Sequence, residues 1–241
     1  MTSITHVRRW FYVVMAYVAA LVAVIGFSKR YFGAVAAGTL HAPAIVHFHG
    51  WITFAWLAFL IVQTTLVASG RTELHKSLGL GGIALGTLLV FTATEIAIGL
   101  LAREMREGGP PHLREFFADL ASWILLIAGL FATAIANVGR PEVHKRFMLA
   151  AAFMILTPAW ARIIQLLDGD MSRLMRNDLA MLPADTLVLV AIAYDWKKRG
   201  RPHPAWLWAL GVIVAIQAGG MLVRTTPWWL QVTNWLASLA G

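Results

Sequence analysis

The sequence predicts an all-α membrane protein, a bundle of seven transmembrane helices. Hydrophobic residues make up 59% of the 241 residues and charged residues 13%, whereas an average soluble domain is about 25% charged. One soluble core of this size could not hide so many apolar side chains. Seven segments also approach or exceed the length of about 20 apolar residues that crosses a bilayer. The composition therefore argues against a soluble enzyme, a disordered regulator and a disulfide scaffold.

We expect a single transmembrane domain over residues 1–241. The first apolar run is long and lacks a clear cleavage site, so it predicts a retained helix and not a signal peptide. The tail, residues 224–241, is short and rich in Trp, which suits the membrane interface. The predicted spans cover residues 10–27, 43–69, 78–102, 116–138, 147–167, 179–195 and 204–223.

Basic residues flank the apolar runs and set the expected orientation. They are more numerous in the loops on the side of the N-terminus, where residues 197–201 form the strongest group and Arg146 is counted as a loop residue. The positive-inside rule then predicts a bacterial cytoplasmic (inner) membrane protein with a cytoplasmic N-terminus and a periplasmic C-terminus. The net charge of +8 is better matched by anionic lipid headgroups than by nucleic acid, which we do not expect as a partner. With no Cys, thiolate metal sites and iron–sulfur clusters are excluded.

A short motif occurs twice, at the inner turns of two predicted helix hairpins. Residues 70–76 are GRTELHK and residues 139–145 are GRPEVHK. One explanation is a duplicated turn, in which Gly ends a helix and the basic residues meet headgroups. The other uses His75 and His144, which the repeat puts at the same depth on different helices. Two such imidazoles are what bis-His haem b requires.

The second predicted helix begins with two histidines, His47 and His49. Side chains two residues apart point about 200° apart on an ideal helix, so a straight helix does not offer both to one ion. His49 lies on one stripe with Trp56 and Gln63, and a Gln in mid-membrane should face protein. We therefore expect His49 to face the bundle and His47 to lie at the interface.

Five predicted helices each place an ionisable residue in the outer half of the membrane. Burying such a group costs about 3 kcal/mol on insertion scales. Three acids against one Arg leave negative charge that protons, a protonated His or a bound cation would balance. The sequence thus predicts either a metal, substrate or proton site, or structural caps and ion pairs. The residues are His49, Glu95, Asp119, Arg162 and Asp185.

In the site hypothesis, His47 and His49 join the carboxylates of Glu95, Asp119 and Asp185 as metal ligands. Histidine with carboxylates suits a divalent transition metal such as Zn, Fe or Mn. Arg162 would then hold an anionic group or balance the carboxylates.

The run from His47 through Gln63 to GRTELHKSLG, and the later GRPEVHKRFMLAAAFMILTPAWARI, resemble a group of uncharacterised bacterial multi-pass membrane proteins. In that group a helix with His and Gln is followed by an Arg and a His-Lys/Arg-x-x-Gly turn. The resemblance covers predicted helices two to five. The group is also distantly similar to b-type membrane cytochromes and ferric-reductase-like bundles, which carry haem between paired His. The resemblance implies a membrane-embedded redox or cofactor-handling role.

Three functions follow as hypotheses. The first is a membrane protein associated with haem b or a divalent metal and involved in redox or cofactor handling. The second is a non-catalytic accessory or assembly subunit of a larger membrane complex, for which an apolar, Trp-rich surface suffices. The third is a proton-coupled transporter of a small solute, because carboxylates in spans are frequent proton relays.

Overall fold

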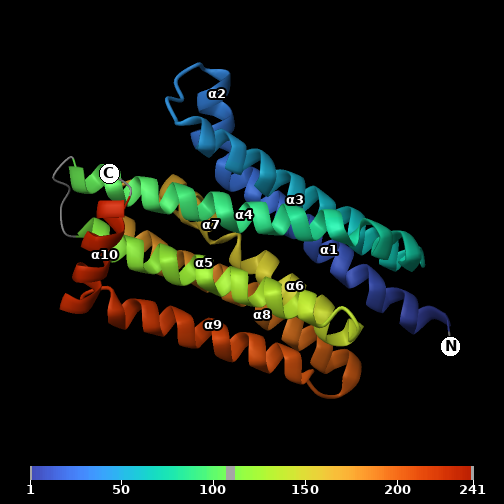
Figure 1. The fold of residues 1–241 in the computed structure, drawn as a ribbon. Coiled ribbons are helices and arrows are strands. Elements are labelled where there is room, and N and C mark those ends of the chain that lie inside the picture. Colours follow the sequence, from blue (N-terminus) through green and yellow to red (C-terminus); the bar gives the residue numbers. More distant parts are fainter. Residues whose placement is uncertain (1, 107–111, 240–241) are drawn as a thin grey trace.

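The computed structural model describes residues 2–106 and 112–239, and these residues form a bundle of helices without strands (Figure 1). Seven helical segments are long and apolar enough to cross a membrane, so the chain is an all-α, multi-pass membrane protein, as predicted. The elements are α1 (Thr2–Phe27), η1 (Ser28–Gly33), α2 (Ala34–Ala36), α3 (Ala44–Ala68), α4 (Thr72–Arg106), α5 (His112–Ala136), α6 (Pro141–Met154), α7 (Thr157–Leu167), α8 (Arg173–Arg199), α9 (Pro204–Val223) and α10 (Pro227–Leu239).

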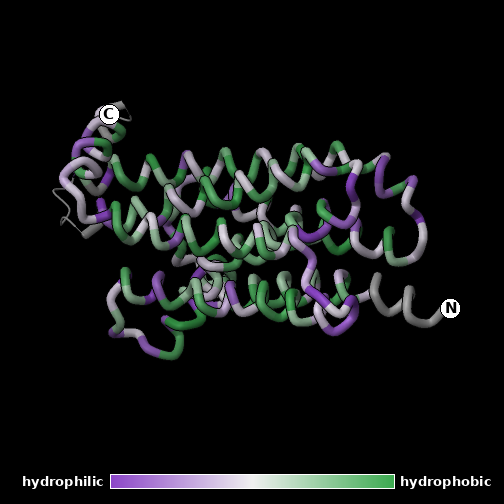
Figure 2. Tube along the Cα trace, turned by 90° about the horizontal axis from the view of Figure 1, so that it is seen from below, coloured by the Kyte–Doolittle hydropathy of each residue, from purple (hydrophilic) through white to green (hydrophobic). Residues whose placement is uncertain are grey.

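The bundle has two polar ends. The hairpin end carries the short turns at residues 69–71, 137–140 and 200–203, and the tail end carries α10. Hydrophobic residues dominate between the two ends, and hydrophilic residues gather on the turns and around α10 (Figure 2). This distribution is that of a helical bundle whose middle lies in hydrocarbon.

The third, fifth and sixth helical segments each begin six residues before the predicted span, and two spans have features of the backbone that were not predicted. The first span runs on through the π-helix η1 and α2 to Ala36. The fifth span is broken into α6 and α7, just before Pro158. Proline lacks the backbone N–H and its ring clashes with the carbonyl four residues back, here that of Met154. The Thr157 hydroxyl donates to this carbonyl (3.2 Å), which keeps it satisfied.

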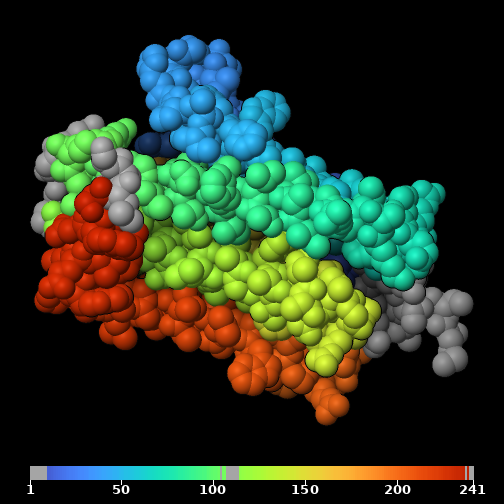
Figure 3. All heavy atoms as spheres, in the orientation of Figure 1, coloured from blue at the N-terminus to red at the C-terminus, as the bar shows by residue number. Residues whose placement is uncertain are grey.

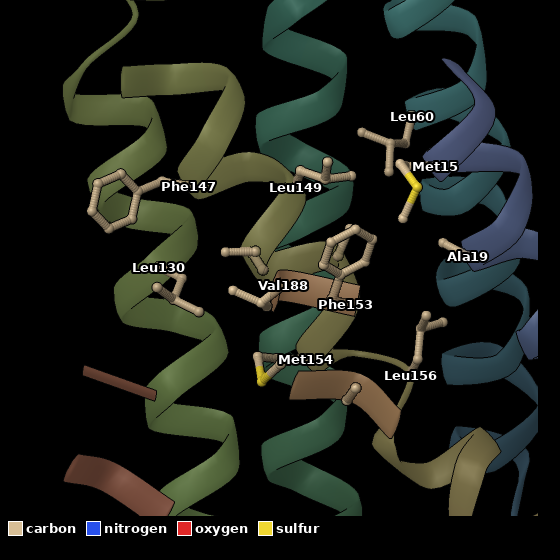
Figure 4. Close-up of a cluster of buried hydrophobic side chains, with 14 of the residues drawn as sticks. Met15, Ala19, Leu60, Leu130, Phe147, Leu149, Phe153, Met154, Leu156 and Val188 are labelled. Atoms are coloured by element: carbon tan, nitrogen blue, oxygen red, sulfur yellow. The ribbon is translucent and has the colours of Figure 1, made fainter. Parts of the chain in front are cut away.

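Helix α6 forms the centre of the core. Its side chains from Leu149 to Met154 are almost completely buried, and it contacts α1, α5, α8 and α9. Figure 4 shows Leu149, Phe153 and Met154 between Leu130 of α5 and Met15 of α1. Since α6 has neighbours on every side, Ala and other small residues on it let the surrounding helices approach.

Glycines on α4 make room for aromatic side chains of its two neighbours. A Cβ built on Gly82 would lie 2.6 Å from the Phe59 ring of α3, and one on Gly86 would overlap the Phe131 ring of α5. The small size of these glycines therefore lets α3 and α5 pack closely on α4. In the space-filling view α4 runs along one face of the bundle (Figure 3).

Helix α10 crosses the tail end of the bundle (Figure 1). Its Trp229 is buried, stacks on Phe117 of α5 with ring centroids 6.0 Å apart, and donates its indole N–H to the Arg114 carbonyl (2.8 Å). Trp228 and Trp235 remain exposed. One Trp thus anchors the tail, and the exposed ones suit the interfacial depth that Trp prefers.

A buried ion pair joins α6 to α8 near the hairpin end. Arg146 is 1% exposed, and its Nη2 lies 2.7 Å from Asp195 Oδ1 while its Nε lies 2.9 Å from Oδ2. A third contact joins its Nη1 to Glu142 Oε2 (2.8 Å). The treatment of Arg146 as a loop residue is therefore wrong. Arg146 lies four and seven residues before Ala150 and Phe153, so it falls on the buried face of α6.

Replacing Arg146 by Ala should strongly destabilise the fold, because the Asp195 carboxylate would stay buried without its partner. Removing one member of such a pair costs about 3–5 kcal/mol. The free energy of unfolding in mixtures of a mild detergent and dodecyl sulfate measures this loss.

Lys76→Ala is the matched control, since Lys76 and its partner Glu73 are largely exposed and such pairs contribute little. The double variant Arg146→Met/Asp195→Leu should recover much of the lost stability, because both charges are gone. Equal losses in Arg146→Ala and Lys76→Ala would contradict the assignment.

Candidate functional site

The two histidines of the repeated motif lie side by side at the hairpin end. The ring centroids of His75, at the start of α4, and His144, at the start of α6, are 6.3 Å apart, and the ring planes are 69° apart. Both residues are partly buried. The repeat therefore brings together the pair of imidazoles that the sequence suggested, from two different hairpins.

Hydrogen bonds fix the orientation of both rings. Gln63 of α3 donates its amide N–H to the His75 carbonyl (3.2 Å), so its Oε1 faces the His75 ring and accepts from Nδ1 (3.1 Å). The Nδ1 of His144 donates to the Ala134 carbonyl of α5 (2.8 Å). Both acceptors are oxygens that cannot donate, so in each neutral ring Nδ1 carries the proton and Nε2 keeps its lone pair.

The sequence repeat explains this arrangement locally. In both turns the Arg carbonyl accepts from the His backbone N–H, at 3.1 Å for Arg71 and 3.0 Å for Arg140. In both turns the following Lys pairs with the Glu three residues earlier, at 2.8 Å for Lys76 and 2.6 Å for Lys145. Equal turns place the two His at equal positions, and contact between α4 and α5 joins the hairpins.

At the tail end, His47 and His49 contact different neighbours. His47 Nδ1 lies 3.1 Å from the Tyr31 hydroxyl of η1. His49 Nδ1 lies 2.8 Å from the Thr92 hydroxyl of α4, inside the bundle. Because α3 is regular over both residues, the two rings diverge, and the geometry does not present them to one ion.

Arg162 of α7 lies near His49 and has no carboxylate partner among the described residues. Its guanidinium stacks over the Phe27 ring, 4.3 Å from the centroid, and its Nη1 donates to the Pro158 carbonyl (2.8 Å). The missing N–H of Pro158 affects the carbonyl four residues earlier, not the carbonyl of Pro158 itself. The hydrogen bond from Arg162 to the Pro158 carbonyl is therefore additional to the backbone hydrogen bonds of α7.

The three acids of the predicted outer site lie apart from one another. Asp119 accepts from Arg224 (3.1 Å), which also binds Asp178. Asp185 accepts from the Gln217 amide (3.0 Å). Glu95 is exposed on α4, on one face with Phe91 and Gly99.

The predicted outer residues therefore do not gather around a common point. Among residues 2–106 and 112–239, no group of three or more His, Asp or Glu side chains is arranged to hold a metal ion. Hydrogen bonding to Asp178, followed by the charges of both acids, raises the pKa of Arg224 above its usual value. This ion cluster thus ties α5, α8 and the end of α9 together.

Sequence reasoning missed the Arg146–Asp195 pair and the role of His203. The His203 ring accepts from the Ala205 backbone N–H (3.1 Å) and caps α9. Burial lowers the pKa of His203, and the nearby charges of Arg146 and Arg199 lower it further. In the sequence, the His-Pro pair just before an apolar run indicates a helix start, because Pro is common at the first position of a helix.

No family model, curated protein or solved structure among those compared matches this chain.

A Cβ on Gly26 would press α1 against α7 and should destabilise the tail end. It would lie 2.6 Å from the Ala159 carbonyl oxygen, so Gly26→Ala must separate the helices that hold Phe27 and Arg162. Overpacking of this kind costs about 1–3 kcal/mol, measurable as the free energy of unfolding in detergent.

Gly211→Ala serves as the control, because no heavy atom lies within 4 Å of a Cβ at this position of α9. Ala favours a helix over Gly by about 0.8–1 kcal/mol, so this variant should keep or gain stability. Loss of stability in both variants to the same extent would show that the α1–α7 contact is not tight.

Proposed function

We propose that this multi-pass membrane protein binds haem b between His75 and His144 and serves in membrane redox or cofactor handling. The observation that carries the proposal is the pair of imidazoles with both Nδ1 atoms committed to neighbouring helices and both Nε2 atoms left as ligands. Metal-ligating histidines usually have their other nitrogen held in this way.

The separation of the rings supports an axial pair. Two imidazoles bound on opposite sides of one metal, at the usual metal–nitrogen distance of about 2.0–2.1 Å, have ring centroids about 6 Å apart. A tetrahedral arrangement brings the centroids to about 5 Å. The 6.3 Å between His75 and His144 is close to the first value.

The number of protein ligands also favours haem over a bare ion. A structural or catalytic ion normally takes three or four protein ligands, and the described side chains contain no such group. Haem iron comes with nitrogen ligands of its own, so His75 and His144 would suffice to hold it. When bound, haem would supply one-electron redox chemistry, while Gln63 and the Ala134 carbonyl would hold the two rings in orientation. We place the hairpin end on the cytoplasmic side of a bacterial inner membrane, in line with the positive-inside rule.

The purified wild-type chain, produced with an ample haem supply, should show a Soret band that changes on reduction. His75→Ala and His144→Ala should each lose most of this absorbance, because each removes one axial ligand. Visible spectra and haem content per chain are the measurements.

His47→Ala is the control, since His47 lies at the opposite end against Tyr31, and it should keep the full spectrum. Size-exclusion profiles separate loss of ligand from loss of fold. A wild-type protein without a Soret band would refute the haem proposal, and a stoichiometric metal in that protein would favour a bare ion.

The accessory-subunit hypothesis is favoured by a different observation. Glu95 is exposed on α4, within a segment apolar enough to span a membrane, and its carboxyl group has no hydrogen bond or ion pair among the described residues. A carboxyl group in hydrocarbon is costly, and a basic or hydrogen-bonding group on a partner helix would satisfy it.

Glu95→Leu should dissociate such a complex. In native gels of membranes extracted with mild detergent, the wild-type chain would migrate with a larger assembly and the variant alone. Leu88→Ala, on the same exposed face, is the control for loss of bulk without loss of charge. Identical migration of wild type and Glu95→Leu would count against a partner at this position.

A further inference from the structure

Arg162 is a cation inside a membrane span with most of its donors unused. The Arg162 side chain is partly buried and its Nη1 donates to the Pro158 carbonyl, while no other hydrogen bond of its guanidinium is present among the described residues. A guanidinium carries five N–H donors in a rigid fork. The Phe27 ring covers one face of the guanidinium and leaves its edge free.

Other positive or imidazole groups adjoin this guanidinium. Arg30 lies in η1, three residues after the Phe27 ring on which Arg162 stacks, so both cations belong to the region where the first span meets α7. No described carboxylate pairs with Arg30 or Arg162, because the acids predicted nearby are bound elsewhere or face outward. A cluster of like charge in a span is unfavourable without a counter-charge.

The backbone around the cluster is specialised. The π-helix Ser28–Gly33 widens the first span where Arg30 and Tyr31 project, and π-helical turns are frequent at functional sites. The Gly26–Ala159 contact brings this turn against α7. Tyr31 then meets His47 of α3 (3.1 Å), so α1, α3 and α7 all contribute to one region.

We propose that Arg162, with Arg30 and His49 beside it, binds an oxyanion at the tail end of the bundle. The free edge of the guanidinium matches a phosphate or carboxylate group through two parallel hydrogen bonds. Arg30 adds a second charge from the exposed side. The bound group supplies the negative charge that the described side chains do not. This site is independent of the haem proposal, which concerns the opposite end.

The oxyanion has two sources, the phosphate of an anionic lipid or a water-soluble phosphate. Two assays on the purified full chain distinguish them. In the first, inorganic phosphate is titrated and the thermal unfolding midpoint is followed. In the second, phosphatidylglycerol retained by the protein after washing in neutral detergent is counted by native mass spectrometry.

Arg162→Gln should weaken phosphate or lipid binding by about tenfold or more, as expected for the loss of a charge-assisted pair. Without anion, this variant should be as stable as the wild type or more so, since an unpaired charge has been removed. Arg30→Gln should weaken binding less. Arg162→Lys, which keeps the charge but not the fork, tests the contact if Arg162→Gln does not fold.

Arg173→Gln is the matched control, because Arg173 at the same end also stacks on a Phe ring, Phe116, but is exposed. It should leave both assays unchanged. Saturable binding in either assay that falls in Arg162→Gln and not in Arg173→Gln supports the site, and the assay that responds identifies the source. Absence of binding in both assays, or equal binding in both variants, overturns it.

Discussion

A charge that leaves water for the interior of a membrane protein needs a partner, and this requirement organises most of the polar contacts here. Arg146 is satisfied by Asp195 across α6 and α8. Arg224 is satisfied by Asp119 and Asp178 across α5 and α8. Each cluster joins helices distant in the sequence near one end of the bundle, where apolar packing alone specifies little about which helices meet. The pairs therefore fix the positions of α5, α6 and α8, on which the remaining helices pack.

The exception to this rule carries the chemical information. Arg162 lies in the same broken span as Arg146, yet its contacts are a carbonyl and an aromatic ring. A structural Arg is expected to resemble Arg146, with a bidentate carboxylate. The contrast between the two residues within one span separates a cation that holds the fold together from one that is left to bind something else.

The duplicated turn works by a different principle. The repeated motif produces the same turn and helix start twice, with an Arg carbonyl that accepts from the His N–H and a Lys–Glu pair. Packing of one hairpin on the other then brings the two His together, although nothing in the sequence shows that they are close. The hairpins are not equivalent in detail. Gln63 holds the first ring, whereas a backbone carbonyl near the end of α5 holds the second. The Ala134 carbonyl also accepts from the Asn137 backbone N–H (3.2 Å), and its second lone pair accepts from the His144 ring, so the second hairpin needs no special side chain.

How far the sequence predicts this structure depends on the range of the interactions. Span positions follow from hydropathy, and the equal depth of His75 and His144 follows from the repeat, because both are local properties. The depth of Asp119 and Asp185 was also predicted, but their partners Arg224 and Gln217 lie on another helix, and no local pattern shows which helices adjoin. The partner of Arg146 is likewise on another helix. Arg146 follows the basic residues of a turn, but its spacing of four and seven residues from Ala150 and Phe153 indicates the buried face of a helix. The π-helix has no local sequence pattern that predicts it. The break between α6 and α7 is indicated only by Pro158.

The two candidate sites lie at opposite ends of the bundle and are joined by α3, which carries His49 and Gln63, and by the broken span of α6 and α7. His144 lies in the first turn of α6 and Arg162 lies in α7, on the other side of the break. Between them lie the most tightly buried residues of the bundle, from Leu149 to Met154, followed by the break before Pro158. A rigid α6 can transmit a shift of its own axis, but the break lets α7 move separately. Substitutions this far apart with no shared partner usually act additively, so ligand binding at either end is expected to be independent of the residue chosen at the other.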